Sequence, residues 1–116
     1  MNEIDILRIK TLLNHIDTVL SDTKDISASE LFKNDLLLRA TSFSIVQIGE
    51  MMIQLQRHLN DEYPDLPWAQ ARRMRNIIIH DYGNIDIELV YDTIRNDLPV
   101  LKNELIKIQN KFSSNS

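Results

Sequence analysis

Apolar residues recur at alternating spacings of three and four along most of the chain, which is the period of an amphipathic helix. The first apolar stripe ends at the polar run SDTKD and comprises Ile6, Ile9, Leu13, Ile16 and Leu20. A second stripe follows a serine at position 27 or 29 that can cap a helix, runs to NDEYPDLP and comprises Leu38, Ile45, Ile48, Met52, Leu55 and Leu59. No segment alternates as a strand would, so the pattern predicts an all-α fold.

Two further helices are predicted in the second half of the chain. The third covers PWAQARRMRNIII, residues 67–79, with Pro67 in its first turn and Gly83 and Asn84 at or just after its end. The fourth begins after the capping residue Asp86, and its stripe comprises Ile87, Tyr91, Ile94, Leu98, Leu101, Leu105 and Ile108. Pro99 should kink or split it. Four main helices with short connections predict an antiparallel up-and-down bundle.

Gly49 interrupts the apolar stripe of the second helix. A glycine inside a helix costs up to about 1 kcal/mol relative to alanine, so its presence needs a reason. Two explanations stay open, namely the close approach of another backbone and a kink in the helix.

Composition places the chain among single globular domains, with 116 residues of which 43% are hydrophobic and 26% charged. The domain is expected over residues 1–110, followed by a disordered tail at 111–116. With no cysteine there is neither a disulfide framework nor a thiolate metal site. No apolar run approaches the roughly 18 residues of a membrane span, so a cytoplasmic protein is predicted. The net charge of -4 implies that any RNA contact is local.

The segment RNIIIHDYG, residues 75–83, places polar groups around three isoleucines. Arg75 and His80 are five residues apart, so on one helix their side chains point about 140° apart and cannot reach the same atom. Either the helix ends before His80 and the chain bends, or the site combines groups from two copies of the chain. The position of His80 also has a simpler explanation, in which this histidine only stabilises the C-terminal end of the helix.

The run from Arg75 and Asn76 through His80 to Tyr82 resembles the defining motif of the HEPN superfamily, and in detail that of its HepT-like toxins. The flanking segments are similar as well: IGE at 48–50, PWAQARRMRN before the motif and IDIELVYDTIRNDLPVL after it. The resemblance covers roughly residues 4 to 108.

This resemblance implies a metal-independent endoribonuclease that acts as a homodimer, with the two copies of the motif meeting at a cleft. Arg75 and His80 are the implied catalytic residues, and cleavage of RNA should leave a 2′,3′-cyclic phosphate and a 5′-hydroxyl. His80 suits proton transfer near neutral pH, and Arg75 can hold two phosphate oxygens. Asn76 either orients the phosphate or the histidine or only covers the helix surface. Glu50 is expected to pair with an arginine of the third helix.

The resemblance further implies the toxin of a type VII-like toxin–antitoxin pair. Its antitoxin would be a cognate nucleotidyltransferase of the MntA kind, which attaches AMP to Tyr82. No cofactor or metal is predicted, because His15 and His58 have no ligand-like spacing to His80. Trp68 is predicted to be a core or interface anchor. The alternative function is a non-catalytic helical protein that binds a nucleotide or docks a nucleotidyltransferase.

Overall fold

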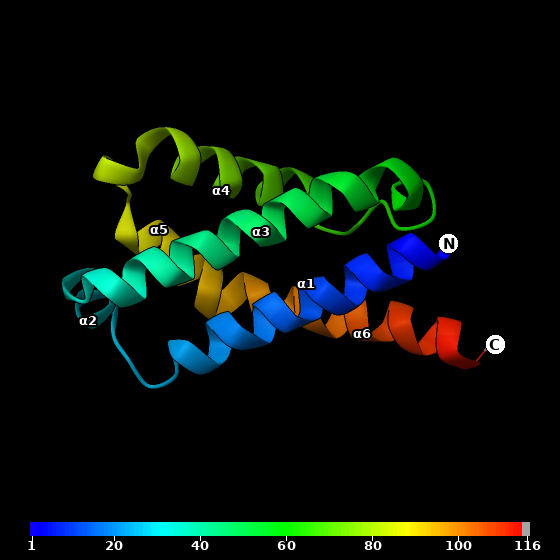
Figure 1. Cartoon of the computed structure of the whole chain (residues 1–116), viewed down its shortest axis with the longest axis horizontal. Helices are drawn as coiled ribbons and strands as arrows, with labels where there is room; N and C mark the ends of the chain where they lie inside the picture. Colours follow the sequence, from blue (N-terminus) through cyan, green and yellow to red (C-terminus); the bar gives the residue numbers. More distant parts are fainter. Residues whose placement is uncertain (115–116) are drawn as a thin grey trace.

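The structure, a computed structural model, describes residues 1–114 of the chain. Its elements are α1 (Glu3–Asp22), α2 (Ala28–Lys33), α3 (Asp35–Leu59), α4 (Trp68–Asp81), a 3₁₀ turn (Tyr82–Asn84), α5 (Ile87–Asp92), a π-helical turn (Thr93–Asp97) and α6 (Leu98–Ser114). No strand occurs among these described residues. The long helices α1, α3, α4 and α6 alternate in direction, and both termini lie at the same end of the bundle (Figure 1). The predicted all-α up-and-down bundle is confirmed.

Helix α3 is the central element, since it packs on α1 along one side and on α4 along the other, while α1 also packs on α6. Its predicted core positions Ile45, Ile48, Met52, Leu55 and Leu59 are all buried. The predicted stripe of α1 needs one correction, because Ile6 is exposed and the buried face instead includes Leu12 and Val19. The predicted anchor Trp68 lies in the core and donates from Nε1 to the Tyr63 carbonyl at 3.0 Å.

The second predicted helix is wrong in one respect, because it is divided into α2 and α3 at Asn34. This residue has a non-helical backbone and its side chain accepts from the Leu37 amide at 3.0 Å, so it caps α3. Ser27 caps α2, and its hydroxyl and the Glu30 carboxylate each accept from the other residue's amide at 3.1 Å. Asparagine caps helices about as well as serine does, and the chain can therefore turn here at little cost.

The fourth predicted helix begins as expected, with the Asp86 side chain accepting from the amides of Glu88 and Leu89. The π-helical turn at residues 93–97 precedes Pro99. Proline has no N–H to donate to the carbonyl four residues earlier, and its ring clashes with that carbonyl. A wider turn relieves this clash. The kink or split of the fourth helix at Pro99 stays a prediction. The domain boundary at residue 110 and the tail at 111–116 also stay predictions, although α6 continues to Ser114. Residues 115–116 lie outside the described residues.

Gly49 marks the crossing of α3 and α4. A methyl group added to it would lie 2.5 Å from Cβ of Arg75 and 3.0 Å from the carbonyl oxygen of Ala71. Of the two explanations left open by the sequence, close approach of another helix is therefore the one that the structure supports. The glycine lets α4 settle against α3 at the residue that begins the motif.

By length and composition alone, α3 is apolar enough to cross a membrane. Its place between α1 and α4 is nevertheless that of a core helix, with one apolar face against its neighbours. The chain thus forms a globular bundle, and its location in the cytoplasm remains a prediction.

Candidate active site

Arg75 is held in place by two neighbours. Its Nε donates to Oε1 of Glu50 on α3 at 2.7 Å, and one terminal nitrogen donates to Oδ1 of Asn76 at 2.5 Å. The expected pairing of Glu50 with an arginine of the third helix is confirmed. A guanidinium has five N–H groups, so others remain for a ligand. Their direction is fixed by the two existing bonds.

His80 lies in the last turn of an unbroken helix, because α4 continues through Asp81. The idea that the helix ends before His80 is therefore wrong. The side chains of Arg75 and His80 leave α4 about 140° apart. His80 is exposed and, within the described residues, forms no hydrogen bond or ion pair. Its imidazole is thus open to another molecule but not to Arg75 of its own chain.

The isoleucines between these residues do not share one environment. Only Ile78 is buried, at 4% exposure, whereas Ile79 is 49% exposed. The three isoleucines therefore do not all pack into the bundle, since successive residues of a helix point about 100° apart. Tyr82 follows in the 3₁₀ turn and is 40% exposed.

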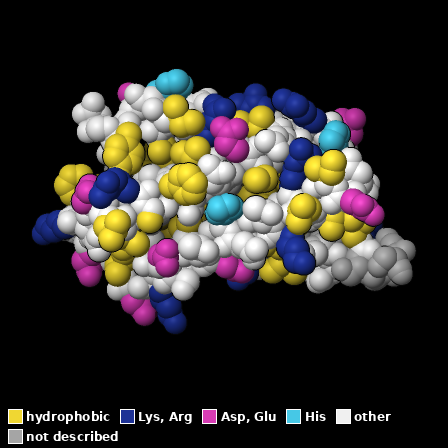
Figure 2. Space-filling model, viewed as in Figure 1, with side chains coloured by type: hydrophobic (Ala, Val, Ile, Leu, Met, Phe, Trp, Pro, Cys, Tyr) yellow, Lys and Arg dark blue, Asp and Glu magenta, His cyan; other side chains and the backbone are white. Residues whose placement is uncertain are grey.

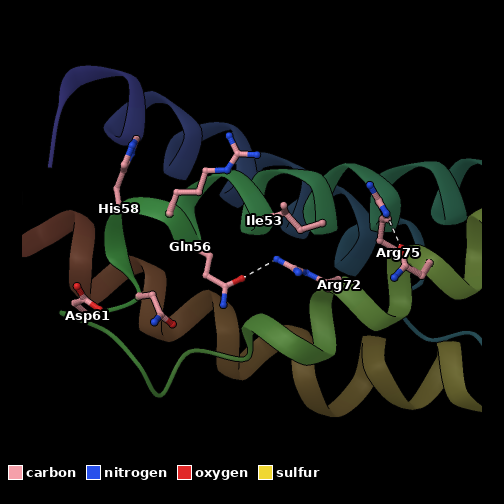
Figure 3. A pocket seen from close by; sticks show the side chains of 9 residues that line it. Ile53, Gln56, His58, Asp61, Arg72 and Arg75 are labelled. Atoms are coloured by element: carbon pink, nitrogen blue, oxygen red, sulfur yellow. Dashed lines mark hydrogen bonds between the residues drawn. The ribbon is translucent and has the colours of Figure 1, made fainter.

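An open groove of about 590 Å³ runs along α3 and α4 and reaches Arg75 and Asn76. Arg57 and Arg72 also line it, and Arg72 donates to Oε1 of Gln56 at 3.1 Å across the two helices (Figure 3). Arginine thus dominates the charge of this groove, although the whole chain carries a net charge of -4. Nothing in the sequence singled out Arg57, although it lies seven residues after Glu50 and so on the same face of α3.

His58, at one edge of the groove, is bound to a buried carboxylate. Its Nδ1 lies 2.9 and 3.0 Å from the two oxygens of Asp5, which is 1% exposed, and its ring points toward α1 (Figure 3). Arg8 also donates to Asp5, at 3.2 Å. Burial acts to raise the pKa of the Asp5 carboxyl, but the hydrogen bonds and charges of His58 and Arg8 act in the opposite direction and hold this pKa below its usual range. No sequence signal pointed to this pair, because its members are 53 residues apart.

Residues 9–108 match the model of the HepT-like ribonuclease family. The chain belongs to this family. The HepT-like match covers α1 from Ile9 and extends into α6, so it includes the whole of α3, α4 and the motif between Arg75 and Tyr82.

Several curated proteins are similar to this HepT-like chain. A putative RNase of Methanocaldococcus jannaschii is 30% identical over 94 residues, which cover 81% of this chain and 86% of that protein. A probable ribonuclease HepT of Thermococcus cleftensis is 23% identical over 104 residues, or 86% of this chain and 94% of that protein. A Methanocaldococcus jannaschii protein named gamma-glutamylcyclotransferase and putative RNase is 31% identical, and this chain spans 50% of its length. No solved structure matches significantly.

Proposed function

We propose that this HepT-like chain is the toxin of a toxin–antitoxin pair, a cytoplasmic, metal-independent endoribonuclease that works as a homodimer. The observation that carries the proposal is the unbroken helix α4, which presents Arg75 and His80 on different sides. Two such residues act on one phosphate only if each site takes them from different chains. The match to HepT-like ribonucleases and the open imidazole of His80 support the same proposal.

The chemistry needs only the groups that the motif provides. RNA carries its own nucleophile, the 2′-hydroxyl, and attack on the adjacent phosphorus expels the 5′-oxygen and leaves a 2′,3′-cyclic phosphate. His80 exchanges protons with these oxygens, while Arg75 from the other chain stabilises the charge that develops on the phosphorus-bound oxygens. Glu50 and Asn76 hold the guanidinium in one orientation, which lowers the cost of organising it during the reaction.

An exposed apolar patch on α3 and α4 is the surface through which we expect two chains to dimerise. Leu36 and Phe43 on α3 are 73% and 62% exposed, and Ile79 on α4 is 49% exposed. Leu36, Phe43, Glu50 and Arg57 recur every seven residues, so they share one face of α3 that is apolar at one end and charged at the other. On the side of the molecule seen in Figure 2, many hydrophobic side chains lie toward the left and several Lys and Arg side chains lie along the upper middle. Dimerisation at the apolar end would bring the two α4 helices together.

The catalytic roles are tested by replacing each residue separately. His80→Ala and Arg75→Ala should each lower RNA cleavage by at least about a thousandfold, and growth arrest on expression should be lost. His80→Ala should keep the melting temperature, because this side chain is exposed and has no partner among residues 1–114. His15→Ala is the matched control and should cleave as the parent does. Cleavage should survive EDTA, and full ribonuclease activity of His80→Ala would overturn the proposal.

Covalent control at Tyr82 forms the second part of the proposal. The tyrosine is 40% exposed in the short turn after α4, and its hydroxyl has no partner within the described residues. Such a phenol can enter the active site of a nucleotidyltransferase, where its oxygen attacks the α-phosphate of ATP. AMP is then joined to the tyrosine, pyrophosphate leaves, and a base of that enzyme takes the phenolic proton. The added phosphodiester would lie two residues from His80 and repel RNA by its negative charge.

Intact mass measurement after co-expression with a cognate nucleotidyltransferase tests this step. The parent chain should gain units of about 329 Da, the mass of one transferred AMP, and should lose toxicity. Tyr82→Phe should gain none and stay toxic. Tyr91→Phe is the matched control, since the Tyr91 hydroxyl already donates to the Ile26 carbonyl, and it should be modified like the parent. Neutralisation of Tyr82→Phe to the parental extent would favour control by complex formation.

A further inference from the structure

The groove between α3 and α4 contains positive charge that the chain itself leaves uncompensated. Arg57 makes no hydrogen bond or ion pair among the described residues, and Arg72 has only the neutral amide of Gln56 as a partner. Among the described residues, Asp61 is the one carboxylate that lines the groove, and in Figure 3 it lies at the end far from Arg75. Guanidinium groups without carboxylate partners, gathered in a concave surface, concentrate anions even on an acidic protein.

The groove leads along α4 toward the candidate catalytic histidine. Arg72, Asn76 and His80 follow one another at four-residue spacing, so they form one row on this helix. The row extends about 12 Å along the helix axis. Successive nucleotides in one strand of a duplex rise by about 3.4 Å, so the row is long enough to contact more than one nucleotide. Arg57 faces this row from α3, because it lines the same groove as Arg72 and Asn76.

His58 gives the groove a second feature, a fixed hydrogen-bonding edge. An ionised carboxylate only accepts hydrogen bonds, so the proton of the His58–Asp5 contact resides on Nδ1. Asp5 is 1% exposed and also accepts from Arg8, and it therefore cannot turn away to water. The histidine is thereby held at the rim of the groove.

From this arrangement we propose that the groove is a binding site for single-stranded RNA, in which Arg57 and Arg72 hold backbone phosphates next to the nucleotide that is cut. The inference rests on the proposed ribonuclease function and adds how the substrate is held. Arginine suits this role because its planar fork matches two phosphate oxygens. The site would grip the backbone without reading the bases.

Binding is measured by fluorescence anisotropy with a fluorescein-labelled, fully 2′-O-methylated oligoribonucleotide of about twelve nucleotides. This probe cannot be cut, since its 2′-oxygens are blocked. Arg57→Gln and Arg72→Gln should each weaken binding roughly tenfold at 0.1 M salt. Each should also reduce the slope of log K against log salt by about 0.7, the value for one lost phosphate contact to a single strand.

Arg73→Gln is the matched control, because it removes the same charge from the adjacent residue, which lines a pocket on another side of α4. It should bind the probe within about twofold of the parent and with an unchanged slope. Equal losses of affinity in all three variants, or no loss in any of them, would overturn the proposal that RNA binds in this groove.

Cleavage of native RNA separates this inference from the function on which it rests. The Arg57→Gln/Arg72→Gln double variant should raise KM and change kcat little, since neither residue is placed at the reacting atoms. If the double variant is active and its KM is unchanged, the proposal that RNA binds in this groove would be overturned, while the ribonuclease proposal would stand. A parent chain that binds the probe through the groove but never cuts native RNA would overturn the ribonuclease proposal and leave the groove supported.

Discussion

Asp5 shows how much one buried carboxylate contributes to joining distant parts of this chain. Its two oxygens face Nδ1 of His58, and Oδ1 also accepts from Arg8. Through these contacts the start of α1 is joined to the last turn of α3, which carries part of the arginine groove. Asp5 is 1% exposed, so losing a partner leaves a buried carboxylate with fewer hydrogen bonds, which typically costs about 1–3 kcal/mol.

The lowered pKa of Asp5 gives a prediction for stability against pH. A carboxyl whose folded pKa lies below its unfolded value of about 3.9 stabilises the fold fully above that value, and this contribution disappears as the pH falls through the folded pKa. Asp5→Asn should therefore be less stable than the parent by about 1–3 kcal/mol at pH 7. This difference should shrink below about pH 4. Urea unfolding between pH 3 and pH 7 measures it.

Asp22→Asn serves as the control, because Asp22 is exposed at the other end of α1. Its effect on the free energy of unfolding should stay within about 0.5 kcal/mol at every pH. A difference between Asp5→Asn and the parent that stays constant down to pH 3 would show that the carboxyl is not linked to folding in this way.

At the scale of the elements, the crossing of α3 and α4 positions the motif. Gly49 allows the two helices to approach closely, and the next residue, Glu50, binds the arginine at that crossing. The close approach and the ion pair thus lie side by side. Any residue larger than glycine at position 49 must push α4 outward, together with the guanidinium on it.

Gly49→Ala should accordingly lower both stability and cleavage. Alanine favours a helix by about 1 kcal/mol over glycine, but its methyl would lie 2.5 Å from Cβ of Arg75, an atom fixed to the α4 backbone. Overpacking of this kind typically costs about 1–3 kcal/mol, and a displaced Arg75 should lower kcat by roughly ten- to a hundredfold. Thermal unfolding and cleavage of native RNA measure the two effects.

Gly83→Ala is the comparison, since a methyl group there meets no atom within 4 Å. Its free energy of unfolding should stay within about 0.5 kcal/mol of the parent. If Gly49→Ala were as stable as Gly83→Ala and as active as the parent, the crossing would not need a glycine.

For the whole molecule, the central question is how Arg75 and His80 meet. One copy of α4 presents them about 140° apart, and the apolar patch on α3 and α4 offers a surface for a second copy. A closed two-fold dimer would contain two equivalent sites. Each site would use the arginine of one chain and the histidine of the other.

Mixed dimers test this arrangement directly. Arg75→Ala and His80→Ala chains, each inactive alone, should regain activity when co-expressed, because a mixed dimer has one site with both residues intact. Random pairing makes about half of the dimers mixed, so roughly a quarter of the parental activity is expected. A mixture as inactive as its components would contradict the shared site. Sedimentation at micromolar concentration should give twice the chain mass of 13.6 kDa.

The sequence by itself determined the fold class, most of the buried face of each helix and several of the caps. These features depend on local periodicity and on the chemistry of single residues such as Ser27 and Asp86, which a sequence displays openly. The motif residues Arg75 and His80 were also recognisable, because their types and spacing are themselves the signal. The break at Asn34 was not foreseen, since its side chain caps a helix only once the chain has turned.

Only the tertiary structure decided what surrounds the motif. The pairing of Asp5 with His58, the approach of Gly49 to Arg75 and the arginine groove each join residues that are far apart in the chain. They depend on how one helix is rotated and shifted against another. Helical periodicity defines which face is buried but leaves this rotation and shift undetermined, because ridges and grooves allow several packings of the same faces. Side-chain packing at the α3–α4 crossing selects one of them.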